Sequence, residues 1–153
     1  GDGPLRKKLE ALAHALGIAE WVSFLGSLPH EDVKQWLRRS HAFILPSVTA
    51  SNGDVEGIPV ALMEAMAAGL AVVSTEHSGI PELIEDRKTG FLAPERDVET
   101  LASRLRFIVE NPERCELISR EARRKVEADF NMERLDDELA EILSRYGKSR
   151  QAA

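Results

Sequence analysis

Short apolar runs that alternate with amphipathic segments constrain the fold of this chain more than any other feature. The runs are Ala42–Leu45, Ala71–Ser74 and a smaller one at Gly90–Leu92, and the segments between them have the spacing of helices. A strand that is apolar on both faces must be covered on both, as in a parallel sheet flanked by helices. We therefore predict an α/β fold, a Rossmann-like parallel sheet with helices on both faces. All-β and helical-bundle folds are excluded.

Helical periodicity predicts the remaining elements. Residues 4–16 are expected to form a helix that ends at Gly17, followed by a strand at residues 21–25 and a helix at 31–39. Trp21 and Trp36 are expected in the core. Further helices are expected over residues 59–69, 82–86, 98–110, 112–128 and 132–146. The last three carry narrow apolar stripes, which indicates helices that lie on a surface.

Composition excludes several classes of protein. A net charge of −6 over 153 residues, in mixed-sign helical patches, argues against a nucleic-acid partner. Cys115 has no partner for an internal disulfide, and no apolar run is long enough to span a membrane, so we predict a reduced, cytoplasmic setting. No spacing typical of metal ligands occurs, and we predict no metal. The scattered histidines are expected in surface or cap positions: His14, His30, His41 and His77.

Ligands of open parallel sheets bind beyond the carboxyl ends of the strands. In this sequence the expected ends are the loops at 26–28, 46–57 and 74–81. The middle loop is the longest and leads directly into a helix start at Gly57–Val60. Free backbone N–H groups and the positive end of the helix dipole make such a start suited to phosphate.

Two glutamates, Glu56 and Glu64, flank this helix start. A carboxylate can accept hydrogen bonds from both hydroxyls of a sugar diol, so the pair could hold the two ends of a nucleotide-sugar. Glu64 lies in a helix that is apolar nearly all round, where a charge needs a partner. An ion pair to a neighbouring helix explains Glu64 equally well.

The stretch Glu56–Gly69 resembles the E-x7-E signature of family-4 glycosyltransferases, retaining enzymes of the two-Rossmann GT-B class. Other segments resemble that family in its order: Gly1–Pro4, Val22–Gly26, Ile44–Ser47, Ala71–Thr75, Gly79–Glu82 and Thr89–Leu92. Within this signature region, the sequence Gly53–Pro59 is most similar to that of enzymes that build bacterial exopolysaccharide, colanic-acid-type or lipopolysaccharide chains.

The resemblance implies roles for these residues. Glu56 contacts the hydroxyls of the donor sugar, and Glu64 binds the ribose diol. Backbone N–H groups from Gly57 through Ile58 to Val60 face the diphosphate, although Pro59 offers none.

Two other segments receive roles in the same way. Ser27 and Leu28 border the base. The turn at His77–Pro81 lies near the diphosphate, where a structural role is as well supported.

The resemblance also implies the domain organisation. Residues 1–110 form a donor-binding domain, incomplete at its N-terminus, and the helices of 111–147 pack on it or cross to an absent acceptor-binding domain. Residues 148–153 form a disordered tail. The family's basic pair for the diphosphate lies upstream, and the Arg and Lys residues of this chain are expected on helices rather than in ligand loops. The isolated chain is expected to self-associate or to need a partner.

The resulting hypothesis is the donor-nucleotide-sugar-binding portion of a retaining glycosyltransferase that transfers a hexose to a saccharide or lipid-linked saccharide. It needs no cofactor. The basic stretch Arg120–Lys125 allows a peripheral contact with an anionic membrane. Two alternatives stay open: a non-catalytic nucleotide-sugar-binding module, and a sugar-nucleotide epimerase of GT-B build.

Overall fold

The computed structural model describes residues 2–151, and the chain divides after Arg39 into two compact units. The first unit holds α1 (Arg6–Ala15), the short 3-10 helix η1 (Ala19–Trp21) and α2 (His30–Arg39). As predicted, Gly17 follows the end of α1 in the left-handed region, with a φ of 68°. Gly17 N donates to His14 O and Ile18 N to Ala13 O, a pair of bonds that closes the helix end.

The strand expected at residues 21–25 is wrong. The backbone of Val22 is extended, but none of the described residues up to Arg39 belongs to a strand. An extended segment forms a strand through hydrogen bonds to a neighbouring strand, and this unit provides none. The loop at 26–28 is therefore not the carboxyl end of a strand.

The prediction that the two tryptophans lie in the core is also wrong. The side chain of Trp21 is 86% exposed, and Trp36 is exposed as well. The guanidinium of Arg39 lies 5.7 Å from the centre of the Trp36 ring, within the range of a cation–π contact. In this unit only Ala13 and Leu37 are buried among the described hydrophobic residues, so two large rings have no interior to enter.

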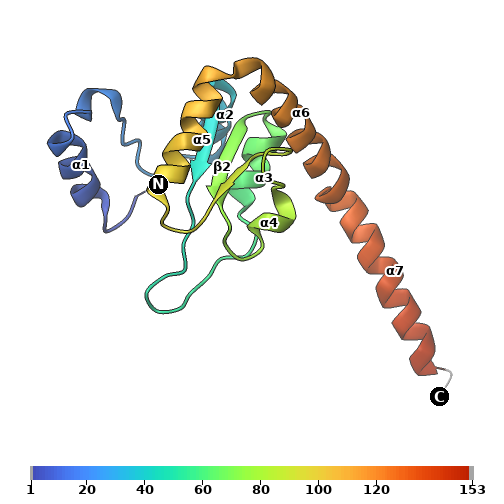
Figure 1. The fold of residues 1–153 in the computed structure, drawn as a ribbon. Coiled ribbons are helices and arrows are strands. Elements are labelled where there is room, and N and C mark those ends of the chain that lie inside the picture. The colour runs from blue at the N-terminus through green and yellow to red at the C-terminus, as the bar shows by residue number, and fades with distance from the viewer. Residues whose placement is uncertain (1, 152–153) are drawn as a thin grey trace. The chain divides into compact units, whose positions relative to one another are not determined.

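The second unit is built on a parallel sheet of three strands in the order β1 (Ala42–Leu45), β2 (Ala71–Thr75) and β3 (Phe91–Ala93) (Figure 1). Ala42 pairs with Ala71, and Val73 with Phe91. This confirms the predicted α/β class. Every residue of the central strand β2 is buried, whereas Ile44 on the edge strand β1 is exposed. The prediction that helices cover both faces of each strand is therefore wrong for β1.

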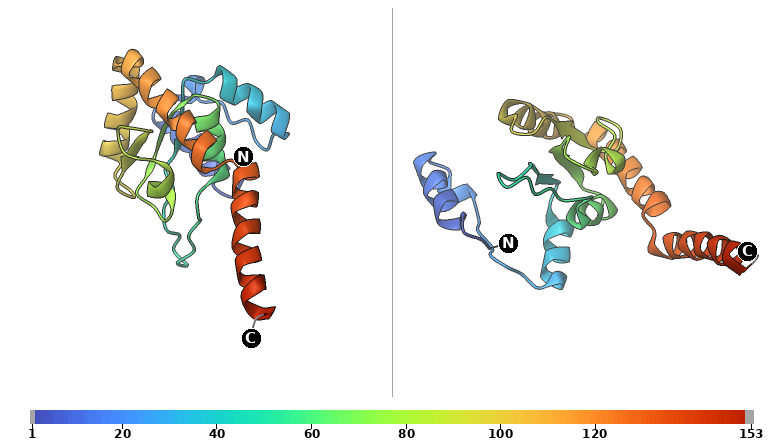
Figure 2. Two further views of the ribbon diagram at one scale, coloured as in Figure 1. Left: turned by 90° about the vertical axis from the view of Figure 1, so that its right-hand side faces the viewer. Right: turned by 90° about the horizontal axis from the view of Figure 1, so that it is seen from below.

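Helices cover the sheet on both sides. They are α3 (Val60–Ala67), α4 (Ile80–Leu83), α5 (Val98–Glu110) and α6 (Pro112–Asp129). Figure 2 shows α3 and α5 on opposite faces of the strands. Helix α5 contacts β2 and β3, while α6 packs against both α3 and β2. One part of the core joins Val73, Phe91, Ile108 and Cys115, so sheet, α5 and α6 share a buried interior.

Most predicted elements are present with small shifts. The short helix expected at 82–86 is found at Ile80–Leu83, and the strand expected at Gly90–Leu92 is found one residue later. The last helix, α7 (Met132–Gln151), extends beyond its predicted end and overlaps the tail expected at 148–153. Of that tail, residues 152 and 153 lie outside the described residues. No helix within residues 2–151 is both long and apolar enough to cross a bilayer.

Candidate functional site

The three strands run in parallel, so their carboxyl ends place three loops at one edge of the sheet. These loops are residues 46–59 after β1, 76–79 after β2 and 94–97 after β3. The sequence indicated the first two. The third was missed, although the strand before it was expected and the same rule applies to it.

Loop 46–59 ends at the start of α3. Glu56 and Gly57 are exposed, Ile58 is half-buried, and Pro59 is buried at the position that precedes the helix. Leu62 N and Met63 N both donate to Pro59 O, at 3.0 and 3.5 Å. The helical hydrogen bonds therefore begin there, and the amides at the first two helical positions have no acceptor within the helix. This arrangement suits an anion, as predicted.

Glu64 lies on α3 four residues after Val60, on the same face of the helix. Glu64 is half-buried and Val60 is exposed. Helical side chains lean toward the helix N-terminus, so the Glu64 carboxylate lies on the side of the candidate anion site. The structure thus brings Glu56, the helix start and Glu64 into one region.

Ser27 and Leu28 belong to the first unit, between η1 and α2. Ser27 is exposed and Leu28 is half-buried. Leu28 lines a shallow depression of this unit together with side chains of α2: Asp32, Gln35, Trp36 and Arg39.

A carboxylate that the sequence did not indicate connects all three loops. Glu95 Oε2 accepts from Thr49 N at 2.9 Å, and Glu95 Oε1 accepts from Thr49 Oγ1 at 3.2 Å. His77 Nδ1 lies 2.6 Å from Glu95 Oε1. The hydrogen bond from His77, followed by that from the Thr49 amide, holds the pKa of Glu95 below its usual value.

Side-chain to backbone bonds also join the loops. Ser74 Oγ donates to Leu45 O at 2.6 Å, and Thr75 Oγ1 donates to Ser47 O at 2.5 Å. Arg96, in the left-handed region with a φ of 65°, donates from Nη2 to Thr49 O at 3.0 Å. The expectation that basic side chains lie on helices and not in these loops is therefore wrong for Arg96.

Two buried polar atoms at this edge have no hydrogen-bond partner among the described residues, Ser47 Oγ and His77 Nε2. His77 is 1% exposed, so the expected surface position is wrong for this histidine. Its short loop folds inward against Glu95. Because buried polar atoms are usually paired, the carboxyl edge retains unused hydrogen-bonding capacity.

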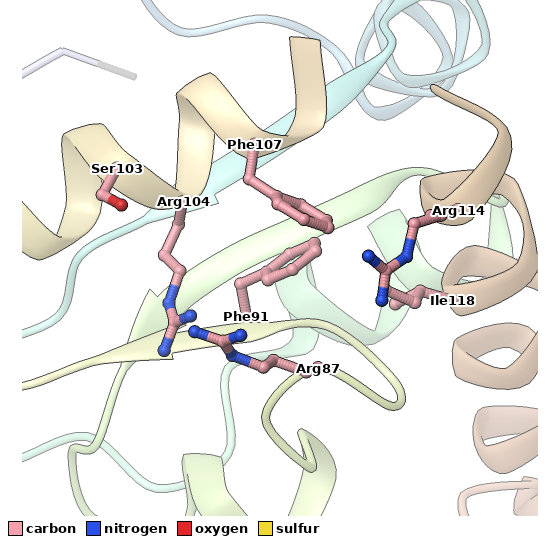
Figure 3. A pocket seen from close by; sticks show the side chains of 7 residues that line it. All are labelled: Arg87, Phe91, Ser103, Arg104, Phe107, Arg114 and Ile118. Atoms are coloured by element: carbon pink, nitrogen blue, oxygen red, sulfur yellow. The ribbon is translucent and has the colours of Figure 1, made fainter. Parts of the chain in front are cut away.

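A second pocket lies at the start of β3, between the loop before that strand and helices α5 and α6 (Figure 3). The rings of Phe91 and Phe107 are 5.5 Å apart, and the Arg114 guanidinium lies 5.4 Å from the centre of the Phe107 ring. Arg104 donates to Leu92 O at 3.1 Å and to Asp86 Oδ2 at 2.9 Å. None of the predicted site residues lines this pocket.

The basic stretch at 120–125 is largely balanced by acids. Arg120 pairs with Glu116 at 2.5 Å and Arg123 with Glu127 at 2.7 Å, both on α6. Arg124 likewise pairs with Glu121. These basic side chains therefore lie in exposed ion pairs along the helix. Across residues 2–151, no three His, Cys, Asp or Glu side chains gather as a metal site requires.

Residues 1–125 match the family described as "Glycosyl transferases group 1". Over 145 residues the chain is 47% identical to WcaL of Escherichia coli (strain K12), a candidate colanic acid biosynthesis glycosyltransferase, covering 94% of this chain and 36% of WcaL. It is 46% identical to the amylovoran biosynthesis glycosyltransferase AmsK of Erwinia amylovora, covering 95% of this chain and 36% of AmsK. The chain thus spans about a third of the length of these curated relatives.

Solved structures share the fold. The structure of Anabaena Alr3699/HepE in complex with UDP matches with a TM-score of 0.82 and 27% identity, over 91% of this chain and 36% of HepE. A sucrose-phosphate synthase from Thermosynechococcus elongatus matches with a TM-score of 0.83 and 23% identity, over 97% of this chain and 36% of that protein. The expected GT-B relationship is therefore confirmed at the level of fold.

Proposed function

This chain belongs to the group 1 glycosyl transferases, and we propose that it is the donor-nucleotide-sugar-binding part of a longer, retaining family-4 enzyme. The enzyme transfers a hexose from a nucleotide diphosphate to a saccharide or lipid-linked saccharide. The name of its relative AmsK, an amylovoran biosynthesis glycosyltransferase, supports an acceptor of the bacterial exopolysaccharide type.

One observation carries this proposal: two glutamates flank an open helix start at the carboxyl edge of the sheet. Glu56 is exposed just before α3, and Glu64 lies on the face of α3 that continues from Val60. The HepE structure in complex with UDP has the same fold, which supports a nucleotide ligand for this chain.

In the proposed reaction the bond between the sugar C1 and the diphosphate oxygen breaks, and the acceptor hydroxyl oxygen bonds to C1 with retained configuration. The hydroxyl proton passes to the departing diphosphate. The negative charge on the departing diphosphate is stabilised by the N-terminus of α3. Glu56 accepts hydrogen bonds from the sugar hydroxyls and orients the ring. Glu64 accepts from the two ribose hydroxyls.

The proposal assigns the reaction to the cytoplasm and includes no metal cofactor. In place of a metal, the backbone amides from Gly57 to Val60, apart from Pro59, and basic residues of the longer enzyme stabilise the negative charge of the diphosphate. Transfer that is unchanged in the presence of EDTA supports this part of the proposal, and transfer that stops on chelation and returns with a divalent cation contradicts it.

The test compares transfer with nucleotide binding in the full-length enzyme. Glu56→Gln keeps the size of the side chain but replaces one acceptor with a donor. We expect transfer from a panel of UDP-, GDP- and ADP-hexoses to fall about a hundredfold, equal to about 2.7 kcal/mol of transition-state stabilisation. Calorimetric affinity for the bare nucleotide diphosphate should stay within about twofold, since Glu56 acts on the sugar.

Glu113→Gln is the matched control, because Glu113 is exposed in the first turn of α6 and the exchange is the same. It should leave both measurements unchanged. Near-normal turnover of Glu56→Gln would remove the main support for a transferase. Binding of nucleotide-sugars without turnover by the wild-type enzyme would favour a non-catalytic binding module.

A further inference from the structure

Glu95 is the residue whose side chain contacts both of the other loops at the carboxyl edge. It lies in the loop after β3 and bonds to Thr49, 46 positions earlier, and to His77, 18 positions earlier. Its two oxygens receive three donors from two other loops. One carboxylate therefore fixes the relative position of all three loops.

Thr49 is held by both of its backbone polar groups and by its side chain. Its N–H and hydroxyl bond to Glu95, and its carbonyl accepts from Arg96. Directly after it the chain folds into a closed turn, in which Ala50 N donates to Asp54 O at 3.0 Å and Gly53 N to Ala50 O at 2.9 Å. Glu56 follows this turn by two residues, so the direction in which it leaves the sheet depends on the anchor at Thr49.

The loop that carries His77 also contacts the other end of loop 46–59. A Cβ atom built on Gly79 would lie 2.9 Å from Ile58 Cγ1, so the backbone of Gly79 approaches Ile58 as closely as a glycine allows. The segment with Glu56 is thus held at Thr49 by Glu95 and at Ile58 by the loop of His77. His77 itself is bound to Glu95.

We propose that Glu95 is a positioning residue for sugar transfer, which acts through Thr49 and His77 to fix the loop that presents Glu56. This inference rests on the proposed function. Glu95 touches no substrate in this role. Because α3 begins at Val60, after loop 46–59, we expect loss of Glu95 to affect the orientation of the sugar more than nucleotide binding.

His77 provides the second half of this device. Its Nδ1 lies 2.6 Å from Glu95 Oε1 and donates to that carboxylate, while Nε2 has no hydrogen-bond partner among the described residues. The side-chain amide of an asparagine can present an N–H close to the position of Nδ1, whereas a leucine fills the space without a donor. His77→Asn should therefore preserve the function of His77, and His77→Leu should reproduce the loss of Glu95.

The first experiment measures the loop directly, by hydrogen exchange with mass spectrometry on the full-length enzyme. Glu95→Gln replaces one of the two acceptor oxygens with an NH2 group, so one oxygen remains for the donors of Thr49 and His77. Thr49→Val removes only the hydroxyl contact. We expect exchange in the peptide covering 46–59 to rise about tenfold in Glu95→Gln, and less in Thr49→Val. Peptides of α5 should be unchanged, and Glu113→Gln should match the wild type throughout.

The second experiment measures kcat with the donor panel and calorimetric affinity for UDP, GDP and ADP. Glu95→Gln and His77→Leu should lower kcat about tenfold, His77→Asn less than about threefold, and nucleotide affinity should stay within about twofold. An equal fall in affinity and kcat, or wild-type exchange at 46–59, overturns the positioning role.

The failure of this inference is distinguishable from that of the proposed function. Wild-type turnover that Glu95→Gln leaves intact overturns the inference alone. A wild-type enzyme that transfers no hexose from any donor overturns the proposed function and this inference with it.

Discussion

The two ends of the same sheet are built differently. At the carboxyl edge, Glu95 and Arg96 bond to a segment more than forty residues away, and two buried polar atoms lack a partner among the described residues. At the opposite end, the pocket of Figure 3 is lined by the tilted pair of rings Phe91 and Phe107 and by Arg104, whose guanidinium is paired with Asp86. Phe91 is the first residue of β3, at the amino end of the sheet, and Glu95 lies four residues later, at the carboxyl edge.

This difference separates an amino end that stabilises the fold from a carboxyl edge with unpaired polar atoms near the proposed ligand site. Buried apolar surface and paired charges hold the amino end, and changes there should alter the free energy of unfolding. The carboxyl edge carries the proposed ligand contacts, and changes there should alter affinity or turnover. The predictions below separate these two outcomes.

The largest expected effect belongs to the amino end. Phe91 is fully buried, packs against Phe107 and joins the core shared by the sheet and α5. Phe91→Ala should lower the free energy of unfolding by about 3–5 kcal/mol, because it leaves a cavity. Urea denaturation of the full-length enzyme measures this. A loss below about 1 kcal/mol would mean that the site collapses freely and that this end is not the stabilising one.

The next effect belongs to the carboxyl edge. If Glu64 binds the ribose diol, Glu64→Ala should weaken binding of the nucleotide diphosphate by about 2–3 kcal/mol, as expected for hydrogen bonds to a charged group. Calorimetric titration measures the affinity, and the melting temperature is recorded beside it. Unchanged affinity with a large loss of stability would assign Glu64 to a structural ion pair and would contradict the comparison.

A smaller effect is expected at Arg104. Its side chain is 16% exposed and bonds to Leu92 O and Asp86 Oδ2. Arg104→Met should lower stability by about 1–2 kcal/mol through the loss of these bonds, with nucleotide affinity unchanged. Arg87→Met is the control, since Arg87 is 69% exposed and lies 3.7 Å from Asp86, and it should change stability by less than about 0.5 kcal/mol. A fall in nucleotide affinity for Arg104→Met would contradict the assignment of stability to the amino end and of ligand binding to the carboxyl edge.

The smallest effect depends on pH. Hydrogen bonds from His77 and Thr49 lower the pKa of Glu95 in the folded chain. The ionised carboxylate therefore stabilises the fold above its unfolded pKa, near the ordinary value of 4.5, and this contribution is lost as the pH falls through the folded value. The difference in melting temperature between wild type and Glu95→Gln should be largest above that pH and should close below it. The corresponding difference for Glu113→Gln should stay flat, and a Glu95→Gln difference that widens in acid would contradict the assigned contacts.

The sequence by itself determined the elements whose signals are local. The apolar runs at 42–45 and 71–75, the helices around them and the start of α3 after Pro59 follow from periodicity and turn residues within a few positions. Glu56 and Glu64 could be selected for the same reason, because a loop, a helix start and one helical face place them together.

Tertiary structure decided what depends on partners distant in the chain. The segment at 21–25 has the residues of a strand but no neighbouring strand in its unit, and Trp21 has no interior to enter. The contacts of Glu95 with Thr49 and His77 span 46 and 18 residues and exist only because three parallel strands end side by side. Local propensity acts over a few residues, whereas strand pairing, burial and hydrogen bonds between loops depend on which segments the fold brings together.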